Sequence, residues 1–222
     1  MRVLCHLPLS PFCRSVRIAL AEKRLPFDLA LEEPWQRRSE FLALNPAGDV
    51  PVLIDGANMV ICGPWPLLEY LDDAYPEVPL MGTTLEARAE VRRLVSWFHD
   101  KFNREVTEPV AGQKLIRRFQ KESAPDAATI RSGLARVHDH LEYISLLAEQ
   151  RSWLAGNSLT MADIAACAHL SVLDYLGDVP WDRYPEARTW YARMKSRPGF
   201  RPLLSDTVPG MPPVSHYADV DF

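Results

Sequence analysis

The pattern of apolar and polar positions changes near residue 79, which divides the chain into two parts with different periodicities. The first part predicts short, mixed elements. A strand is expected from Arg2 to Leu7, because this run is short and mostly apolar. A helix should follow, with Ser10 as its N-cap and Pro11 at its first position. Its buried face is indicated by apolar residues at helical spacing, namely Phe12, Val16, Ala19 and Leu20.

The remainder of this first part continues to alternate between strands and helices. Strand periodicity appears at residues 27–31, and residues 34–44 predict a short, irregular helix. The apolar runs 50–54 and 59–62 flank Asp55-Gly56, a turn signal that indicates an antiparallel hairpin. Another helix is expected from Trp65 onward. The predicted order is therefore β-α-β-α-β-β-α.

Beyond Pro79 the periodicity is that of long helices. Apolar stripes over residues 91–102 and 130–144 predict two amphipathic helices. Residues 160–176 are apolar nearly all round, so we expect this helix at the centre of the domain, and Pro185 opens a further helix. After Leu204 the chain is too rich in proline for a helix. The pattern predicts an α/β domain over residues 1–78, an all-α domain over 84–204 and an extended tail over 205–222.

Composition narrows the function classes. The formal charge of −4 at pH 7 argues against a nucleic-acid-binding protein, which would usually carry a basic face. No apolar run approaches the roughly 20 residues of a membrane-spanning helix, and the first residues lack the regions of a signal peptide. The cysteines form no Cys-x-x-Cys pair, which argues against a disulfide framework or a metal site; they are Cys5, Cys13, Cys62 and Cys167. We therefore expect a cytoplasmic protein that is not inserted in a membrane.

Three local patterns, taken in order, resemble the glutathione-transferase superfamily over roughly residues 1–204. The first is Ser10-Pro11-Phe12-Cys13 between a strand and a helix, and the second is the segment 45–53 around Pro51. The third runs from Trp153-Leu154-Ala155-Gly156 through Thr160-Met161-Ala162-Asp163 to the last helix. The resemblance implies a thioredoxin-like N-terminal domain followed by an all-helical domain.

Thr160 and Asp163 stand three residues apart before an apolar run, which is the spacing of a capping box. Each side chain can then satisfy an unpaired backbone N–H of the other, and loss of this cap should cost on the order of 1 kcal/mol. A catalytic role for Asp163 is the less favoured interpretation.

The resemblance also indicates which residues correspond to the family's glutathione site. Ser10 occupies the position that faces the glutathione sulfur in many relatives, although it can equally serve only as a helix cap. Because this position is a serine, Cys13 has no partner for dithiol chemistry, and we expect Cys13 to be buried and inert. A cis Pro51 would aim the backbone of Val50 into the cleft, where the family holds the cysteinyl part of glutathione; the same turn is also required by the fold itself.

The segment that begins at Ile61 departs from the family's pattern. Alignment on Glu69-Tyr70-Leu71 puts Gly63 and Pro64 where active relatives have an acidic residue and a serine that hold the γ-glutamyl group. Glycine lacks the carboxylate, and proline lacks both the hydroxyl and the backbone N–H. Two lost charge-assisted hydrogen bonds, each worth roughly 1.5–3 kcal/mol, would weaken a micromolar site to millimolar or worse. We interpret the glutathione site as degraded, and we expect no cofactor and no confident catalytic residue.

The last residues and the Gly63-Pro64 replacement together resemble the glutathione-transferase-like cell-division proteins of alphaproteobacteria that bind the tubulin-like protein FtsZ. A disordered end is the plainer interpretation of the tail. The partner-binding candidates that the tail offers are Tyr217, Asp219, Asp221 and Phe222.

A basic run in the helical part offers a second candidate surface, although it can equally be a solvated helix face. It comprises Lys114, Arg117, Arg118 and Lys121, interleaved with apolar residues. The resemblance also implies a homodimer. Two function classes remain: a non-catalytic protein that binds FtsZ filaments and regulates cell division, and a glutathione transferase with a divergent site that uses Ser10.

Overall fold

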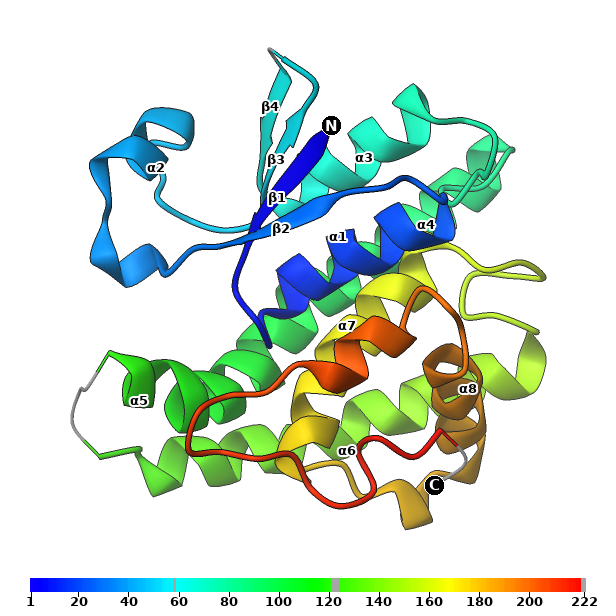
Figure 1. Ribbon diagram of the computed structural model, residues 1–222. Helices are drawn as coiled ribbons and strands as arrows, with labels where there is room; N and C mark the ends of the chain where they lie inside the picture. The colour runs from blue at the N-terminus through cyan, green and yellow to red at the C-terminus, as the bar shows by residue number, and fades with distance from the viewer. Residues whose placement is uncertain (58, 121–123, 221–222) are drawn as a thin grey trace.

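A four-stranded sheet forms the N-terminal part of the chain in the computed structural model, which describes residues 1–57, 59–120 and 124–220 (Figure 1). The strands lie in the order β2-β1-β3-β4, with the bounds β1 (Arg2–His6), β2 (Asp28–Leu31), β3 (Val52–Asp55) and β4 (Met59–Cys62). β1 runs parallel to β2 and antiparallel to β3, and β3 and β4 form the expected hairpin. Leu4 of β1 pairs with Leu29 on one side and Leu53 on the other, which defines the register.

Helices cover both faces of this sheet, with the bounds α1 (Pro11–Glu22), α2 (Ser39–Leu44) and α3 (Pro64–Ala74). Successive residues of a strand point to opposite faces. Leu4 therefore packs in the large apolar cluster that includes residues of α1 and α3, whereas its neighbour Cys5 packs against Phe41 of α2. The predicted element order and the thioredoxin-like fold class are confirmed.

The prediction of one irregular helix over residues 34–44 was wrong in detail. A short 3-10 turn, η1 (Pro34–Gln36), precedes α2 and is separated from it by Arg37 and Arg38. Arg37 adopts the left-handed conformation, with φ of 47°, which an α-helix cannot include. The apolar spacing of this segment gave no sign of that break.

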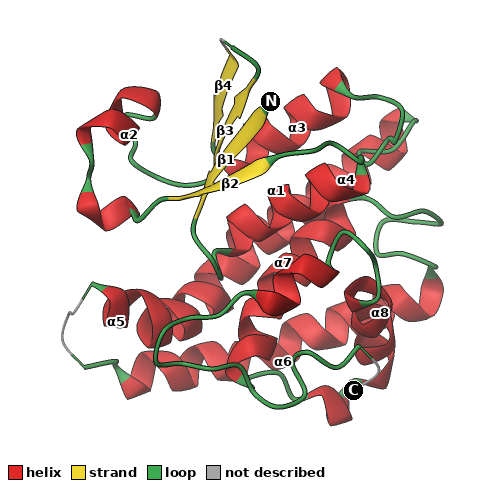
Figure 2. Cartoon of the chain, viewed as in Figure 1, coloured by secondary structure: helices red, strands yellow, loops and turns green. Residues whose placement is uncertain are grey.

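The remainder of the chain is helical and lies below the sheet in the view of Figure 2. Its elements are α4 (Leu85–Ser96), η2 (Trp97–Ile116), α5 (Arg117–Phe119), α6 (Ala127–Gln150), α7 (Met161–Leu176), η3 (Trp181–Arg183), α8 (Pro185–Lys195) and η4 (Arg201–Ser205). α4, η2 and α5 follow one another without interruption and form one long helix. Its middle part, η2, winds more widely, with π-helical hydrogen bonding, and contains Pro109, which has no N–H to donate.

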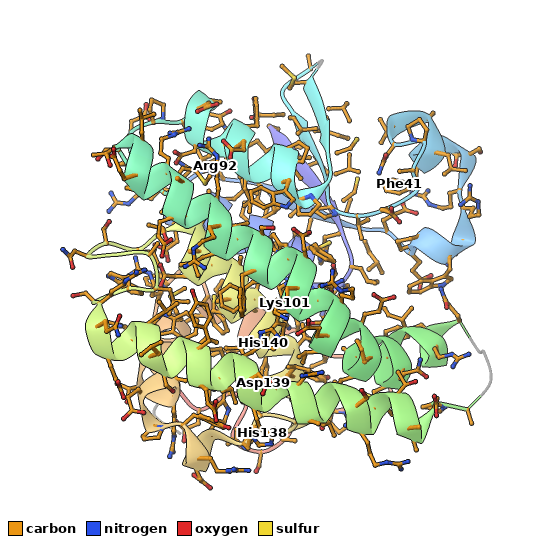
Figure 3. The ribbon with its side chains drawn as sticks, turned by 180° about the vertical axis from the view of Figure 1, so that it is seen from behind. Phe41, Arg92, Lys101, His138, Asp139 and His140 are labelled. Carbon is orange, nitrogen blue, oxygen red and sulfur yellow. The ribbon has the colours of Figure 1, made fainter. Side chains whose placement is uncertain are left out.

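The predicted central helix is α7, whose residues from Met161 to Tyr175 are all buried. It packs against α1 of the sheet domain on one side and against α4 and η2 on the other, so it joins the two parts of the molecule. Seen from behind, the long helix with Arg92 and Lys101 lies beside α6 with His138, Asp139 and His140 (Figure 3). Among the described residues, no helix is long and apolar enough to cross a membrane.

The prediction of an extended tail over residues 205–222 was wrong for the described part, up to residue 220. The tail turns tightly at Val208–Met211, where the N–H of Met211 donates to the oxygen of Val208 at 3.0 Å. A second turn brings the N–H of Tyr217 to the oxygen of Val214, also at 3.0 Å. The tail therefore folds back over the helical domain, as the red trace in Figure 1 shows.

Candidate functional site

Ser10 lies where the sequence predicts it, at the start of α1. Pro11 occupies the first helical position, and the Ser10 Oγ accepts a hydrogen bond from the N–H of Cys13 at 3.4 Å. This contact satisfies one of the unpaired donors at the helix N-terminus. The hydroxyl oxygen therefore acts as a cap, and the side chain remains half-buried at the edge of a cleft.

Cys13 lies in the first turn of α1 with none of its surface exposed. Its Sγ accepts a hydrogen bond from the N–H of Leu7 at 3.5 Å. Burial raises the pKa of the Cys13 thiol to about 11, because the thiolate would lose its hydration there. Since a thiolate is the reactive form of cysteine, this environment favours an inert thiol.

The structure brings together the other residues assigned to the glutathione site. The peptide bond between Val50 and Pro51 is cis, and the Pro51 oxygen accepts a hydrogen bond from the N–H of Gly63 at 3.0 Å. This bond ties the cis-proline turn to the start of α3. Gly63 has φ of +86°, a conformation that residues with a Cβ rarely adopt, so the local backbone favours glycine here.

The N-terminus of α3 has few of the groups that a bound anion needs. Gly63 provides no side-chain cap, and the first turn contains no acidic residue. Pro64 and Pro66 both lie in this turn, so Trp65 is the one residue of the first three with a backbone N–H. A helix N-terminus binds anions through such N–H groups, and this one has lost two of them. Pro66 removes a further backbone N–H, which the sequence-based expectation for Gly63 and Pro64 did not include.

A cleft of about 430 Å³ separates Ser10 from the long helix. Residues of the sheet domain line one wall and residues of η2 line the other; the polar ones are Ser10, Asp49, Asn103, Thr107 and Glu108. Among the described residues that line it, the charged side chains are two carboxylates, Asp49 and Glu108. This lining repels the two carboxylates of glutathione and attracts its single ammonium group, so the net negative charge of the ligand is disfavoured. The residues from η2 were missed in the sequence, because no motif links positions more than 90 residues apart in the chain.

A second cavity, of about 540 Å³, lies on the other side of the loop between β1 and α1. It is lined by Leu7, Pro8, Leu31, Glu33, Trp35, Phe119, Thr207, Val208 and Pro209. The rings of Trp35 and Phe119 stack at 5.8 Å between centroids and connect the two domains across it. Among the residues that the structure describes, no group of three or more His, Cys, Asp or Glu side chains could hold a metal ion.

Thr160 and Asp163 form the expected capping box at the start of α7. The Thr160 Oγ1 accepts from the N–H of Ala162, and the Asp163 carboxylate accepts from the N–H of Thr160 at 3.0 Å. Asp163 also accepts from the N–H of Leu154 and from the indole N–H of Trp190, and it is completely buried. These contacts make Asp163 a structural residue that joins α7 to α8.

The tail residues proposed as partner contacts differ in exposure. Tyr217 has none of its surface exposed, so its assignment as a partner-binding residue was wrong. The centroid of its ring lies 5.2 Å from that of Tyr175, so this aromatic side chain packs within the fold. Asp219 is exposed. Asp221 and Phe222 lie outside the described residues.

The basic run offers a smaller surface than the sequence suggested. The Lys114 Nζ donates to both carboxylate oxygens of Asp178, at 2.6 and 2.7 Å, which neutralises it within the chain. The Arg117 guanidinium is half-buried and donates to Gln113. The side chain of Arg118, and Lys121 as a whole, lie outside what the structure describes. In Figure 1 this end of the long helix and the chain's C-terminus lie on opposite sides of the helical domain, so the two candidate surfaces do not merge.

Comparison with protein-family models matches residues 4–79 to the N-terminal domain of glutathione S-transferases and residues 107–198 to their C-terminal domain. Over 224 aligned residues, covering 100% of this chain and 98% of the relative, the sequence is 46% identical to FtsZ-localized protein A of Caulobacter vibrioides (strain NA1000 / CB15N). It is 28% identical to glutathione S-transferase 3 of Zea mays over 97% of this chain and 98% of that protein.

Solved structures give the same two kinds of relative. A glutathione S-transferase from Rhodospirillum rubrum F11 has a TM-score of 0.98 and 55% identity, with 100% of both chains covered. FzlA from C. crescentus has a TM-score of 0.97 and 46% identity, covering 100% of this chain and 99% of that one. Likeness at this level extends through the tail as well as the two domains.

Proposed function

We propose that this chain, which belongs to the glutathione S-transferase family, uses the family fold to bind FtsZ filaments and regulate cell division, without catalysing glutathione transfer. The observation that carries the proposal is the full-length likeness to FtsZ-localized protein A. That relative's name connects it with FtsZ, and the aligned region extends through the tail, beyond residue 198 where the match to the C-terminal family model ends. The same connection supports a location at the division site.

The geometry of the cleft supports the non-catalytic part of the proposal. The α3 N-terminus lacks the acidic side chain, the hydroxyl and one backbone N–H that would hold the γ-glutamyl group. Two lost charge-assisted hydrogen bonds correspond to about 3–6 kcal/mol, or two to four orders of magnitude in affinity. The carboxylates of Asp49 and Glu108 line the cleft and further disfavour an anionic ligand.

The alternative is a glutathione transferase with a divergent site. Two observations favour it: Ser10 lines a ligand-sized cleft, and the cis bond before Pro51 keeps the backbone geometry that the family uses. A serine hydroxyl at a helix N-terminus could stabilise a thiolate. Binding of glutathione itself distinguishes the two functions, and that measurement closes the Discussion.

Contact with the filament is assigned to the exposed end of the tail. Asp219 is the described acidic residue there, and Asp221 and Phe222 complete the proposed epitope. Arg117 and Arg118, at the far end of the helical domain, form a separate candidate contact. A filament can engage both surfaces if its subunits repeat at a suitable spacing.

Pelleting with FtsZ filaments tests this proposal. The full chain should sediment with filaments assembled in GTP and stay in the supernatant with unassembled FtsZ. Asp219→Lys should weaken this association, because a reversed contact charge costs a few kcal/mol. Asp139→Lys on α6, whose side chain is 63% exposed, is the matched control and should behave like the wild type. A wild-type chain that never pellets with filaments refutes the proposed function, whereas an unchanged Asp219→Lys variant refutes only the tail as the contact.

The same proposal includes a homodimer. Met59 and Val60 on the edge strand β4 are 50% and 38% exposed, and a second copy could cover them. Sedimentation equilibrium should give twice the chain mass of 25.2 kDa, and a single-chain mass would contradict the dimer.

A further inference from the structure

Arg14 of α1 is a completely buried cation at the junction of the two domains and the tail. Its Nη1 donates to the Ser171 Oγ of α7 at 2.7 Å and to the Tyr217 hydroxyl of the tail at 2.9 Å. Its Nη2 forms an ion pair with Asp206 at 3.1 Å. A buried charge is tolerated only where it is paired and hydrogen-bonded. One guanidinium therefore depends on partners from α7 and from two separate positions in the tail.

Asp206 makes a second contact with the sheet domain. Its Oδ2 lies 2.7 Å from the Nη1 of Arg17, one turn along α1 from Arg14. The side chain of Arg17 is 6% exposed and that of Asp206 is 11% exposed, so solvent screens these pairs only weakly. A single carboxylate of the tail thus forms ion pairs with two buried cations of the N-terminal domain.

The tail residues after Asp206 pack closely on α7. The Tyr175 hydroxyl accepts from the N–H of Val208 at 3.1 Å and donates to the oxygen of Met211 at 2.5 Å. The backbone N–H of Val214 donates to the backbone carbonyl oxygen of Tyr175 at 3.2 Å. A Cβ on Gly177 would meet the Val214 side chain at 2.7 Å, so glycine is needed for this approach. These contacts hold the tail at several points along its length.

The same tail segment lines the second cavity and packs against residues that line the cleft beside Ser10. Val208 lines the cavity between the two domains together with Trp35. Val208 and Tyr217 share one apolar cluster with Leu9 and Leu115, both of which line the cleft beside Ser10. Displacing the tail would therefore remove lining residues from the second cavity and packing contacts from Leu9 and Leu115 of the cleft. It would also remove hydrogen-bond and ion-pair partners from Arg14.

We infer that residues 206–217 act as a strap, so that the docked tail, the α1–α7 junction and the cleft walls open and close as one cooperative unit. Removing the strap leaves Arg14 and Arg17 as buried cations without their carboxylate, which destabilises the junction that those cations occupy. Force or binding at the exposed end of the tail is thereby transmitted to the sheet domain and to the cleft. This inference concerns the chain alone and does not depend on the proposed partner.

Site-resolved labelling of the full chain tests the strap. Cys13 of α1 and Cys167 of α7 are completely buried on either side of the junction, whereas Cys62 of β4 is half-buried elsewhere. Pulsed alkylation read by mass spectrometry reports each thiol separately, and hydrogen exchange reports residues 207–217. Asp206→Asn should raise the rates of exchange in the strap and of alkylation at Cys13 and Cys167 together, by about tenfold or more. Cys62 should be unchanged.

A milder variant and a control keep the test decisive if Asp206→Asn folds poorly. Tyr217→Phe keeps the ring but removes the hydroxyl that links Arg14 to the backbone oxygen of Leu203. This variant should raise the alkylation rates of the same two thiols by a smaller factor. In the double variant, the fold increase in the alkylation rates of Cys13 and Cys167 should be smaller than the product of the increases in the two single variants. Asp182→Asn, whose side chain is 98% exposed, should change nothing. Faster exchange in residues 207–217 without faster alkylation of Cys13 and Cys167 would overturn the strap, and so would equal acceleration of all four thiols.

Discussion

Burial controls the chemistry of individual residues around the cleft. Ser10 and Cys13 belong to the same helical turn, yet the serine lies at the cleft edge and the thiol lies beneath it. The Ser10 Oγ accepts a hydrogen bond from the backbone N–H of Cys13, so the serine side chain stabilises the helix start. Burial raises the pKa of the Cys13 thiol, whereas an activated cysteine nucleophile has a lowered pKa.

Cys13 should therefore react slowly with alkylating agents in the folded protein. With its pKa raised to about 11, the thiolate is scarce at neutral pH, and full burial also blocks the reagent. The half-buried Cys62 should label faster, and the rate at Cys13 should rise as pH increases toward 11. Mass spectrometry after timed alkylation measures both. Rapid labelling of Cys13 near pH 7 would indicate a redox role and contradict this assignment.

Sequence reasoning identified residues whose role depends on local geometry and missed those that depend on distant contacts. Ser10, Gly63 and the Thr160–Asp163 box were found because caps and turns follow from spacing within a few residues. The extra partners of Asp163, from Leu154 and Trp190, were not visible, since they come from other elements. The estimate of about 1 kcal/mol for this cap therefore omitted two of its hydrogen bonds.

At the scale of elements, the tail differs most from its sequence-based expectation. Its proline content correctly predicted that the tail is not helical, but proline content does not predict which residues the tail packs against. Tyr217 and Val208 complete an apolar cluster with α7, which only the folded arrangement brings together. Deletion of the last six residues would remove Tyr217, so we expect that deletion to destabilise the fold.

Two truncations separate the contribution of Tyr217 from that of the residues after Ala218. A chain that ends at Ala218 keeps Tyr217 and should unfold at nearly the same denaturant concentration as the full chain. A chain that ends at His216 loses a fully buried aromatic residue and should be destabilised by about 3–5 kcal/mol. Urea unfolding followed by circular dichroism measures both. Equal stability of the two truncated chains would show that Tyr217 contributes nothing to the fold.

At the scale of the whole molecule, buried histidines lie where the domains meet. The His99 Nδ1 and the His169 Nε2 are 3.1 Å apart, and the ring of Phe12 from α1 packs on both. Burial lowers the pKa of His99 to about 4 and lowers that of His169 well below its usual value, because the charged imidazole would be poorly hydrated. Burial also lowers the pKa of His6 to about 4.

These lowered pKa values predict acid sensitivity in a defined window. In the unfolded chain the imidazoles bind protons below about pH 6.5, whereas in the folded chain they do so only near pH 4. The free energy of unfolding should be highest above pH 6.5. As the pH decreases it should fall by about 1.4 kcal/mol per pH unit for each proton that is taken up on unfolding. Urea titrations at pH 7, 6 and 5 measure the slope.

Substitution of His99 tests whether the histidines cause the dependence of the unfolding free energy on pH. Carboxylates with lowered pKa, such as Glu90 at about 2, lose their contribution only below the unfolded value of about 4.5, outside the window tested. His99→Gln should therefore reduce the slope between pH 5 and 6.5 by about one proton. A variant with the wild-type slope would show that His99 does not titrate on unfolding in this range.

The proposed function requires that Gly63 and Pro64 no longer provide the anchor that holds the γ-glutamyl group in active relatives. Calorimetric titration of the full chain with reduced glutathione tests this most directly, since the two candidate functions predict opposite results. We expect no heat of binding at millimolar glutathione, because the lost hydrogen bonds weaken a micromolar site by two to four orders of magnitude. A dissociation constant in the micromolar range would contradict the account and favour a transferase that uses Ser10.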